Sequence, residues 1–283
     1  MSRIVYVNGD YVPEEDAKIS IFDRAFLFAD AIYEVTAILD GKLVDYDAHM
    51  ERLHRSLNEL GMAQPASDAE IREMHEQLMA RNNLTNGMIY MQITRGVAER
   101  DFAYPEADAP QTMIAFTQEK DLANSKQART GIKIVSIPDI RWQRRDIKST
   151  GMLAQAMGKQ AAKDAGVSDA WMVEDGYVTE GTSNTAFIVV DGNKLITRPL
   201  SNAVLPGITR RTILKLAETG AITVEERPFT IEEAKGADEA FITSASSFVM
   251  PVVEIDGTMV GGGQPGPVTR QLREVYLEEA RNG

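Results

Sequence analysis

Lys148 is the residue whose type and surroundings best fit covalent chemistry. It follows an apolar stretch that predicts a strand, at residues 132–137, and precedes a stretch that predicts a helix, at residues 152–165. A lysine at such a junction can be partly desolvated, which favours loss of its proton and lets the amine attack a carbonyl carbon. Taken alone, the pattern fits an ordinary solvated lysine better, because two arginines and an aspartate lie just before it.

Two later motifs supply groups that suit such a lysine. Glu180 stands where a short predicted strand meets a Gly-Thr-Ser-Asn turn, as either a surface carboxylate or the partner of a cationic ring nitrogen. The stretch Leu205-Pro206-Gly207-Ile208-Thr209 opens a predicted helix, whose N–H groups can bind a phosphate, although ordinary helix initiation explains it too. A Schiff-base lysine, a carboxylate for a pyridine nitrogen and a phosphate-binding helix start are the parts of a pyridoxal phosphate site.

Three more residues could complete the phosphate site. Arg52 lies on a predicted amphipathic helix and could be its cationic anchor, or could belong to a solvated helix face. Ser244 and Ser246 follow a predicted strand and could donate further hydrogen bonds, although serines in turns commonly do no more than form the turn.

Two residues could contact a substrate. Arg100 lies in a long loop at residues 95–110 and could bind a carboxylate through two hydrogen bonds, or pair with an acidic neighbour in the loop. Tyr33 alternates onto one face of its predicted strand, where a pocket and a core role are both open. No metal site is predicted, because His49 and His54 are five residues apart and lie on different helix faces.

The composition excludes several classes of protein. The 283 residues suffice for one large or two medium domains, and 43% hydrophobic and 25% charged residues are ordinary for a soluble enzyme. The net charge of −12 argues against nucleic acid and anionic membranes as partners, and the lack of cysteine excludes disulfides and thiolate catalysis. No stretch approaches ~20 apolar residues and the N-terminal residues lack a secretory signal core, so we expect a cytoplasmic protein.

Local signals predict a two-domain fold. Residues 1–118 show strands joined by Asn8-Gly9 and Asp40-Gly41 turns and two amphipathic helices, and we expect a small α+β domain. The first helix should begin after Asp47, and Ser67 with Glu70 predicts a capping box for the second. Residues 119–130 are polar and indicate a linker.

Residues 131–283 predict a larger, mostly β domain that carries Lys148. Its short strands are separated by Asp-Gly turns at residues 175–176, 191–192 and 256–257. We expect helices at residues 152–165, ended by Gly166, and at residues 208–219, ended by Gly220, with further helices from Thr230 and over residues 268–280.

These pieces together resemble the fold-type-IV, or class IV, pyridoxal phosphate aminotransferases. The specific matches are the stretches Asp139-Ile140-Arg141-Trp142, Asp146-Ile147-Lys148-Ser149, Thr179-Glu180-Gly181 and Leu205-Pro206-Gly207-Ile208-Thr209-Arg210. The resemblance covers nearly the whole chain and implies a two-domain α/β (α+β) fold, with the coenzyme in the cleft between the domains of a homodimer. The family includes D-amino-acid (D-alanine) and branched-chain aminotransferases, aminodeoxychorismate lyases and (R)-selective amine transaminases.

The resemblance also implies a role for each candidate residue. Lys148 would be the Schiff-base lysine and proton carrier, and Glu180 the partner of the pyridine nitrogen. Leu205 would pack on the ring. The phosphate would be held by residues from several segments: Arg52, Ile208, Thr209, Ser244 and Ser246. The substrate would contact Tyr33, Arg100 and Phe102.

Within the family, Tyr33-Glu34-Val35 and the Arg100 loop look like the D-amino-acid enzymes. We therefore expect transfer of an amino group from a small D-amino acid such as D-alanine to 2-oxoglutarate or pyruvate. Two departures keep the (R)-amine transaminases in view: Phe102 stands where the family usually has histidine, and Val35-Thr36-Ala37 looks more like the amine enzymes. Branched-chain and aminodeoxychorismate enzymes are further alternatives, as is a binding protein that holds the coenzyme without turnover.

Overall fold

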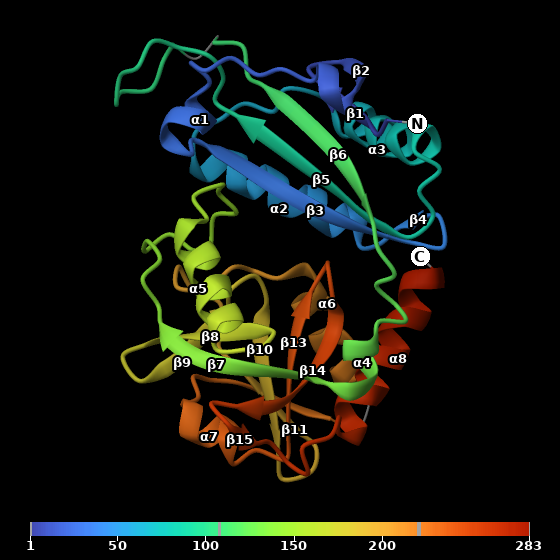
Figure 1. Cartoon of the computed structure of the whole chain (residues 1–283), viewed down its shortest axis with the longest axis vertical. Helices are drawn as coiled ribbons and strands as arrows, with labels where there is room; N and C mark the ends of the chain where they lie inside the picture. The colour runs from blue at the N-terminus through green and yellow to red at the C-terminus, as the bar shows by residue number, and fades with distance from the viewer. Residues whose placement is uncertain (1, 107–108, 220–221, 283) are drawn as a thin grey trace. The chain divides into compact units, whose positions relative to one another are not determined.

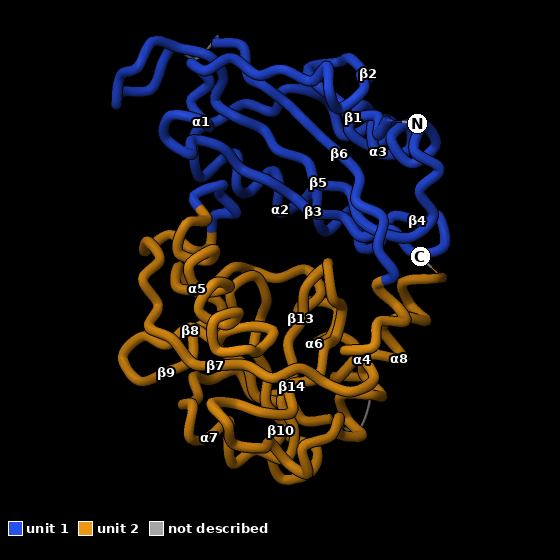
Figure 2. The backbone as a smooth tube through the Cα atoms, viewed as in Figure 1, with its two compact units in different colours: residues 1–121, 147–151 blue, residues 122–146, 152–283 orange. Residues whose placement is uncertain are grey.

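The computed structural model describes residues 2–106, 109–219 and 222–282, and the chain divides into two compact units (Figure 2). Unit 1 comprises Met1–Asp121 and Ile147–Gly151, and unit 2 comprises Leu122–Asp146 and Met152–Gly283. The first change of unit, after Asp121, falls inside the polar segment that we expected to be a linker. Residues 147–151, which include Lys148, group with unit 1, whereas we expected them in the second domain.

The described part of unit 1 forms a six-stranded antiparallel sheet (Figure 1). Its strands, in spatial order, are β2 (Asp10–Pro13), β1 (Ile4–Val7), β6 (Met113–Glu119), β5 (Gly87–Thr94), β3 (Ala31–Leu39) and β4 (Lys42–Leu43). The expected hairpin turns at Asn8-Gly9 and Asp40-Gly41 are confirmed. All four turn residues have the positive φ angles that a two-residue type I′ turn requires.

Two helices, α2 (Tyr46–Glu59) and α3 (Asp68–Arg81), pack on one face of this sheet and build the core of unit 1. The core residues on α2 are spaced as expected for an amphipathic helix, but α2 begins two residues earlier than expected. Asp45 holds the cap position, so Asp47 lies in the first turn. The capping box of Ser67 and Glu70 is confirmed at the start of α3. Two shorter elements are η1 (Glu14–Asp16) and α1 (Arg24–Phe28).

The segment Ile147–Gly151 lies alongside β3 in unit 1. The Ile147 side chain is buried in the core of this unit. The Lys148 carbonyl accepts a hydrogen bond from the Tyr33 N–H (3.0 Å), and the Thr150 N–H donates to the Ala31 carbonyl (3.0 Å). One buried side chain and backbone pairing with β3 therefore explain why these residues group with unit 1.

The described residues of unit 2 form a nine-stranded mixed sheet. Its main path is β12 (Thr223–Glu226), β11 (Lys194–Thr197), β10 (Thr185–Val190), β13 (Glu239–Ser244), β14 (Phe248–Ile255), β7 (Ile132–Pro138), β8 (Asp169–Glu174) and β9 (Tyr177–Gly181), and β15 (Thr258–Met259) pairs with β14. Three pairs are parallel, namely β11 with β12, β14 with β7, and β7 with β8. The three expected Asp-Gly turns are confirmed, with positive φ at both residues of each.

The helices of unit 2 are α4 (Lys126–Thr130), α5 (Leu153–Asp164), α6 (Ile208–Glu218), α7 (Ile231–Lys235) and α8 (Pro267–Asn282). Gly166 follows α5 with a φ of 71°, as its expected stop, whereas Gly220 lies outside the described residues. The short helix α4 lies in the segment expected to be an irregular linker. The mixture of helices and sheets confirms the expected α/β class. Across the described residues, no helix has the length and apolar character that crossing a membrane requires.

Candidate active site

Lys148 is held against the ring of Tyr33 within unit 1. Its Nζ lies 4.1 Å from the centre of the Tyr33 ring. Its backbone N–H donates to the Ser56 hydroxyl on α2 at 3.4 Å, and its carbonyl accepts from the Tyr33 N–H. Lys148 is half-buried. The backbone N–H and carbonyl of Lys148 are therefore both hydrogen-bonded within unit 1. Its side chain lies on an aromatic face rather than extending into water.

Arg52 lies on the buried face of α2, not on a solvated one. Its Nε and Nη2 atoms donate to the two carboxylate oxygens of Glu34 at 2.8 and 2.7 Å, and His49 Nδ1 lies 2.7 Å from the same carboxylate. Burial opposes ionisation of Glu34, but Arg52 and His49 together hold the pKa of Glu34 well below its usual range. Glu34 is therefore a fixed anion that orients the guanidinium of Arg52.

Arg100 and Phe102 are both exposed in unit 1. The guanidinium of Arg100 lies over the rings of Phe28 and Phe102, with distances of 5.5 and 5.4 Å to the ring centres. In the part of the loop that the structure describes, no ion pair joins Arg100 to Glu99 or Asp101. An exposed guanidinium on an aromatic platform is free to bind an anion, and the role of both residues as substrate contacts stays a prediction.

Two buried arginines anchor the loop that carries Arg100. Arg24 and Arg95 both donate to Asp30 Oδ2, at 2.7 and 2.8 Å. Arg24 also donates to the Asp101 carbonyl at 2.7 Å, and the guanidinium of Arg95 lies 3.6 Å from the centre of the Tyr104 ring. These contacts, for which no role was predicted, fix the loop on either side of its exposed residues.

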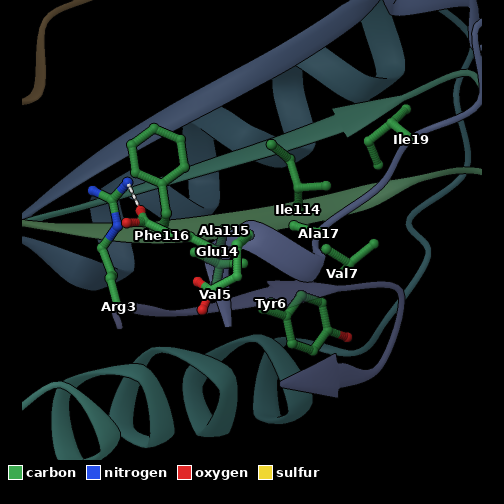
Figure 3. Close-up of a pocket in the computed structure, with 11 residues that line it drawn as sticks. Arg3, Val5, Tyr6, Val7, Glu14, Ala17, Ile19, Ile114, Ala115 and Phe116 are labelled. Carbon is green, nitrogen blue, oxygen red and sulfur yellow. Dashed lines mark hydrogen bonds and ion pairs between the residues drawn. The ribbon is translucent and has the colours of Figure 1, made fainter. Parts of the chain in front are cut away.

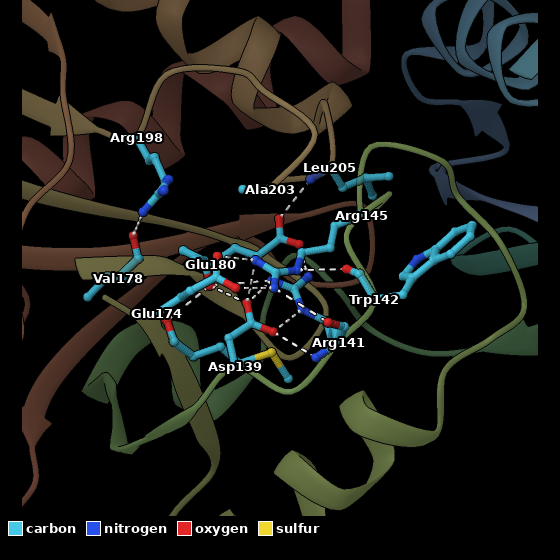
Figure 4. A network of polar contacts seen from close by, with 12 residues as sticks. Asp139, Arg141, Trp142, Arg145, Glu174, Val178, Glu180, Arg198, Ala203 and Leu205 are labelled. Atoms are coloured by element: carbon cyan, nitrogen blue, oxygen red, sulfur yellow. Dashed lines mark hydrogen bonds and ion pairs between the residues drawn. The ribbon is translucent and has the colours of Figure 1, made fainter. Parts of the chain in front are cut away.

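Glu180 is buried on β9 of unit 2 and forms an ion pair with Arg141 (Figure 4). Its other oxygen accepts a hydrogen bond from the Leu205 N–H at 3.1 Å. Arg141 also donates to both oxygens of Asp139, at 3.0 and 2.6 Å, and the Thr179 hydroxyl donates to Asp139 at 2.6 Å. The carboxylate of Glu180 is therefore held in one orientation from two sides.

A third carboxylate and further guanidinium groups extend the network around Glu180. Arg145 lies 3.3 Å from Asp139 and forms a two-bond ion pair with Glu174 (Figure 4). Arg145 lowers the pKa of Glu174, and the charge of Arg198 acts in the same direction. Burial raises the pKa of Glu180, whereas Arg141 and the Leu205 N–H act in the opposite direction. A further cation beside Glu180 would favour its ionised form.

The helix start at α6 is arranged as a candidate anion site. Gly207 holds the cap position and no side chain caps the first turn. A Cβ atom at Gly207 would lie 2.8 Å from the Thr185 hydroxyl, so the backbone here approaches the start of β10 closely. Ile208 and Thr209, the first two helical residues, are buried, and Leu205 just before them is half-buried. Backbone N–H groups at a helix start favour an anion.

The end of β13, which packs against α6, carries a group of hydroxyls. The Ser244 hydroxyl lies 2.7 Å from that of Ser247 and 3.3 Å from that of Ser246. Thr243 pairs with Thr185 on β10, and its buried hydroxyl has no hydrogen-bond partner among the residues that the structure describes. Hydroxyl donors and a helix start in contact with the same strand suit a phosphate.

Each unit holds groups of the kinds that pyridoxal phosphate requires. Unit 1 offers an amine at Lys148 and a cation for a phosphate at Arg52, and unit 2 offers a buried carboxylate at Glu180 for a cationic ring nitrogen and phosphate donors at the start of α6 and at the end of β13. Tyr33, Lys148, Arg52, Arg100 and Phe102 belong to unit 1. The remaining expected site residues belong to unit 2: Glu180, Leu205, Ile208, Thr209, Ser244 and Ser246.

Sequence reasoning gave no role to Glu34, His49, Asp139 or Arg141. Two signals in the sequence point to three of them, Glu34, Asp139 and Arg141. Glu34 is the one charged residue in the otherwise uncharged run of residues 31–39, on the strand face opposite to Tyr33. Asp139 and Arg141 are two residues apart, within reach of each other on an extended segment.

Comparison with known proteins identifies the family of the chain. Residues 31–255 match the family model for class IV aminotransferases. The D-alanine aminotransferase of Staphylococcus epidermidis is 40% identical over 272 residues, which cover 96% of each chain. That of Bacillus licheniformis is 37% identical over 270 residues, covering 95% of this chain and 94% of the relative.

Solved structures of branched-chain amino acid aminotransferases share the fold. The enzyme from Escherichia coli superposes with a TM-score of 0.87 at 27% identity, covering 99% of this chain and 95% of that one. A second such enzyme, solved with pyridoxamine 5'-phosphate, has a TM-score of 0.89 at 26% identity, covering 100% and 95%. By the family match and the near full-length identity to its relatives, the chain belongs to the class IV aminotransferases.

Proposed function

We propose that the chain uses pyridoxal phosphate to move an amino group from a small D-amino acid, such as D-alanine, to a 2-oxo acid such as 2-oxoglutarate or pyruvate. The observation that supports this coenzyme is Glu180, a buried carboxylate that Arg141 and the Leu205 N–H hold in one orientation. The choice of a D-amino acid as the donor is supported by D-alanine aminotransferases that are 37–40% identical to this chain over nearly its whole length.

The binding roles follow from the chemistry of each side chain. A carboxylate at Glu180 keeps a proton on the ring nitrogen, because the ion pair would be lost with that proton. Arg52 supplies a positive charge to the phosphate, and Leu205 packs on the ring. Further phosphate donors come from two segments of unit 2: Ile208 and Thr209 at the start of α6, and Ser244 and Ser246 after β13.

Lys148 is the group that moves protons. When bound, the coenzyme supplies an aldehyde for amines and a ring that accepts electrons. Lys148 would hold the coenzyme through its Nζ. As a free amine, Lys148 would take the proton from the substrate Cα and return it on the coenzyme side. Tyr33, Arg100 and Phe102 orient the substrate.

Borohydride trapping tests the coenzyme and the lysine together. Reduction of the protein with pyridoxal phosphate, followed by peptide mass mapping, should place the adduct on Lys148. Lys159, an exposed lysine on α5, serves as the internal control and should carry none. An adduct elsewhere, or no adduct, would refute the proposal. Loss of the coenzyme's resting absorbance on adding an amine donor separates an enzyme from a protein that only binds the coenzyme.

The second candidate is a branched-chain aminotransferase, favoured by the TM-scores of 0.87–0.89 to such enzymes. Their identities of 26–27% are well below the 40% to a D-alanine aminotransferase, so we place the D-amino acid first. Half-reaction absorbance with D-alanine, L-leucine and (R)-1-phenylethylamine separates the candidates. Turnover of L-leucine without D-alanine would overturn the proposed donor.

Arg100→Ala tests the substrate contact. We expect kcat/KM for D-alanine to fall by about 100-fold, as for loss of a two-bond carboxylate contact of roughly 3 kcal/mol. Turnover of (R)-1-phenylethylamine, which has no carboxylate, should survive. Equal losses for both donors would show that Arg100 acts on the fold rather than on the carboxylate. A homodimer and a cytoplasmic location also stay predictions.

A further inference from the structure

A row of aromatic rings crosses the sheet of unit 1 from Lys148. The ring of Tyr33, on which Lys148 Nζ lies, stacks on Tyr90 with centres 5.4 Å apart and planes at 20°. Tyr90 stacks on Phe116 with centres 4.9 Å apart and planes at 22°. The guanidinium of Arg3 lies 5.4 Å from the centre of the Phe116 ring at the far end, where Figure 3 shows both side chains. A cation therefore stands at each end of three stacked rings.

The strand register produces this row. Tyr90 on β5 lies directly opposite Phe116 on β6. Tyr33 on β3 lies opposite Gln92, two residues after Tyr90, so Tyr33 and Tyr90 are diagonal neighbours on one face. The Tyr90 hydroxyl donates to the Gln92 side chain at 2.8 Å, which fixes the rotation of the Tyr90 ring. Each ring is thus positioned by a strand neighbour as well as by its own backbone.

The contact between Lys148 and Tyr33 favours one protonation state of the amine. A cation within about 6 Å of a ring centre is attracted to the negative face of the ring, and a neutral amine is not. When Nζ takes up the Cα proton, the C–H bond breaks, its electron pair stays with the coenzyme-bound substrate, and the amine becomes an ammonium group. The ring face of Tyr33 stabilises that ammonium group.

We propose that the face of the Tyr33 ring is the docking place of the Lys148 ammonium group, and that Tyr90 and Phe116 are positioning residues that hold this face in place. The proposal rests on the proposed role of Lys148 as the proton carrier. It gives Tyr33 a second role beside substrate contact, and it gives a role to two rings that lie one and two strands beyond Tyr33.

The buried charges of Glu34, Arg52 and His49 pair with one another on the other face of β3. Glu34 points to this face, which is opposite to Tyr33. Ser56, on α2, meets the backbone of Lys148 and carries no charge. Variants of the aromatic row therefore leave these charged contacts unchanged.

The test measures Lys148 in the full-length protein stripped of coenzyme. Acetylation with acetic anhydride over a series of pH values, read by peptide mass mapping, gives the pH midpoint at which Lys148 becomes reactive. Tyr33→Leu should lower this midpoint by about one pH unit, the size of a partly desolvated cation–π contact. Tyr33→Phe keeps the ring face and should leave the midpoint unchanged. Tyr90→Leu and Phe116→Leu should give smaller shifts in the same direction.

Tyr11→Leu is the matched control. It removes a ring from β2 of the same sheet that is in edge contact with Tyr6 and lies outside the row, so the Lys148 midpoint should not move. In the loaded enzyme, Phe116→Leu should lower kcat several-fold with KM for the donor unchanged, because Phe116 acts on Lys148 rather than on substrate binding.

Two results would overturn the proposal. One is that the pH midpoint of Lys148 acetylation in Tyr33→Leu equals that of the wild type. The other is that the midpoints in Tyr90→Leu and Phe116→Leu both equal that of the wild type. This second result would remove the positioning role of the two rings even if Tyr33→Leu fails to fold. Borohydride trapping at Lys148 separates these failures from failure of the proposed function, because it does not depend on the ring contacts.

Discussion

Replacement of Arg141 by leucine should leave Glu180 buried without its cationic partner. Arg141 binds Glu180 and Asp139 at once, and all three side chains are buried. Removing one partner of a buried ion pair costs about 3–5 kcal/mol. At roughly 2–4 °C for each kcal/mol, the midpoint of thermal unfolding should fall by about 6–20 °C.

The loss of stability in Arg141→Leu should depend on pH, and the protonation of Glu180 sets the direction of this dependence. Burial raises the pKa of Glu180, and Arg141 opposes that rise. Without Arg141 the pKa rises further, so the folded protein holds a proton that the unfolded chain, with a glutamate pKa of about 4.3, has released. The folded state then loses stability as pH rises above that value, by ~1.4 kcal/mol for each unit of pKa difference. The difference in unfolding free energy between the wild type and Arg141→Leu should be small near pH ~4 and largest near pH ~7.

A double-mutant cycle measures the interaction energy between Arg141 and Glu180. Denaturant unfolding of coenzyme-free protein is measured for Arg141→Leu, for Glu180→Gln and for both together. We expect a coupling energy of about 1–3 kcal/mol, because the second change removes the carboxylate that the first left without a partner. Arg145→Leu is the matched control. Arg145 is a buried guanidinium of the same cluster that binds Asp139 and Glu174 but not Glu180, and its coupling to Glu180 should be close to zero.

A coupling energy below about 0.5 kcal/mol for Arg141 and Glu180, the usual limit of additivity, would refute the reasoning. A stability gap that does not widen from pH ~4 to pH ~7 would do the same. Either result would mean that Arg141 does not hold the charge on Glu180, and the fit of a cationic ring nitrogen to this carboxylate would lose its physical basis.

Three further perturbations address other parts of the site and fold. Glu34→Gln should destabilise the protein by about 3 kcal/mol at pH ~7, and most of this difference should persist near pH ~4, because Arg52 and His49 hold the pKa of Glu34 well below its usual range and its stabilisation is lost only as pH falls towards that lowered pKa; denaturant midpoints at the two pH values measure this. Gly207→Ala should weaken pyridoxal phosphate binding by roughly tenfold, or ~1.4 kcal/mol, because its Cβ meets the Thr185 hydroxyl, and Thr185→Ala should restore the affinity in a titration. Ser67→Ala should cost about 1 kcal/mol of unfolding free energy and leave turnover unchanged, because it removes only the cap of α3.

Local chemistry accounts for the parts of the fold that the sequence predicts well. The turns at Asn8-Gly9 and Asp40-Gly41 and the capping box of Ser67 and Glu70 depend on residues within a few positions of one another. The start of α2 was misplaced by two residues because Asp45 and Asp47 are both plausible caps, and local chemistry does not choose between them.

The partners of the candidate site residues depend on long-range pairing and were not predicted. Arg52 meets Glu34 only because α2 packs on β3, 18 residues away in the chain. Arg141 meets Glu180 only because β9 pairs beside β8 and returns to the segment after β7. The placement of Lys148 with unit 1 likewise depends on backbone pairing with β3, which no local pattern around Lys148 indicates.

Each unit holds a charged group that suits a different end of pyridoxal phosphate. In unit 1, the cation Arg52 is oriented by Glu34 and is suited to a phosphate. In unit 2, the buried carboxylate of Glu180 is held by Arg141 and is suited to a protonated ring nitrogen. Pyridoxal phosphate carries both of these charges, an anion at one end and a ring nitrogen that can be cationic at the other. A ligand with only one of these charges would match only one of the two groups, so both groups together favour a phosphorylated pyridine more specifically than either group alone.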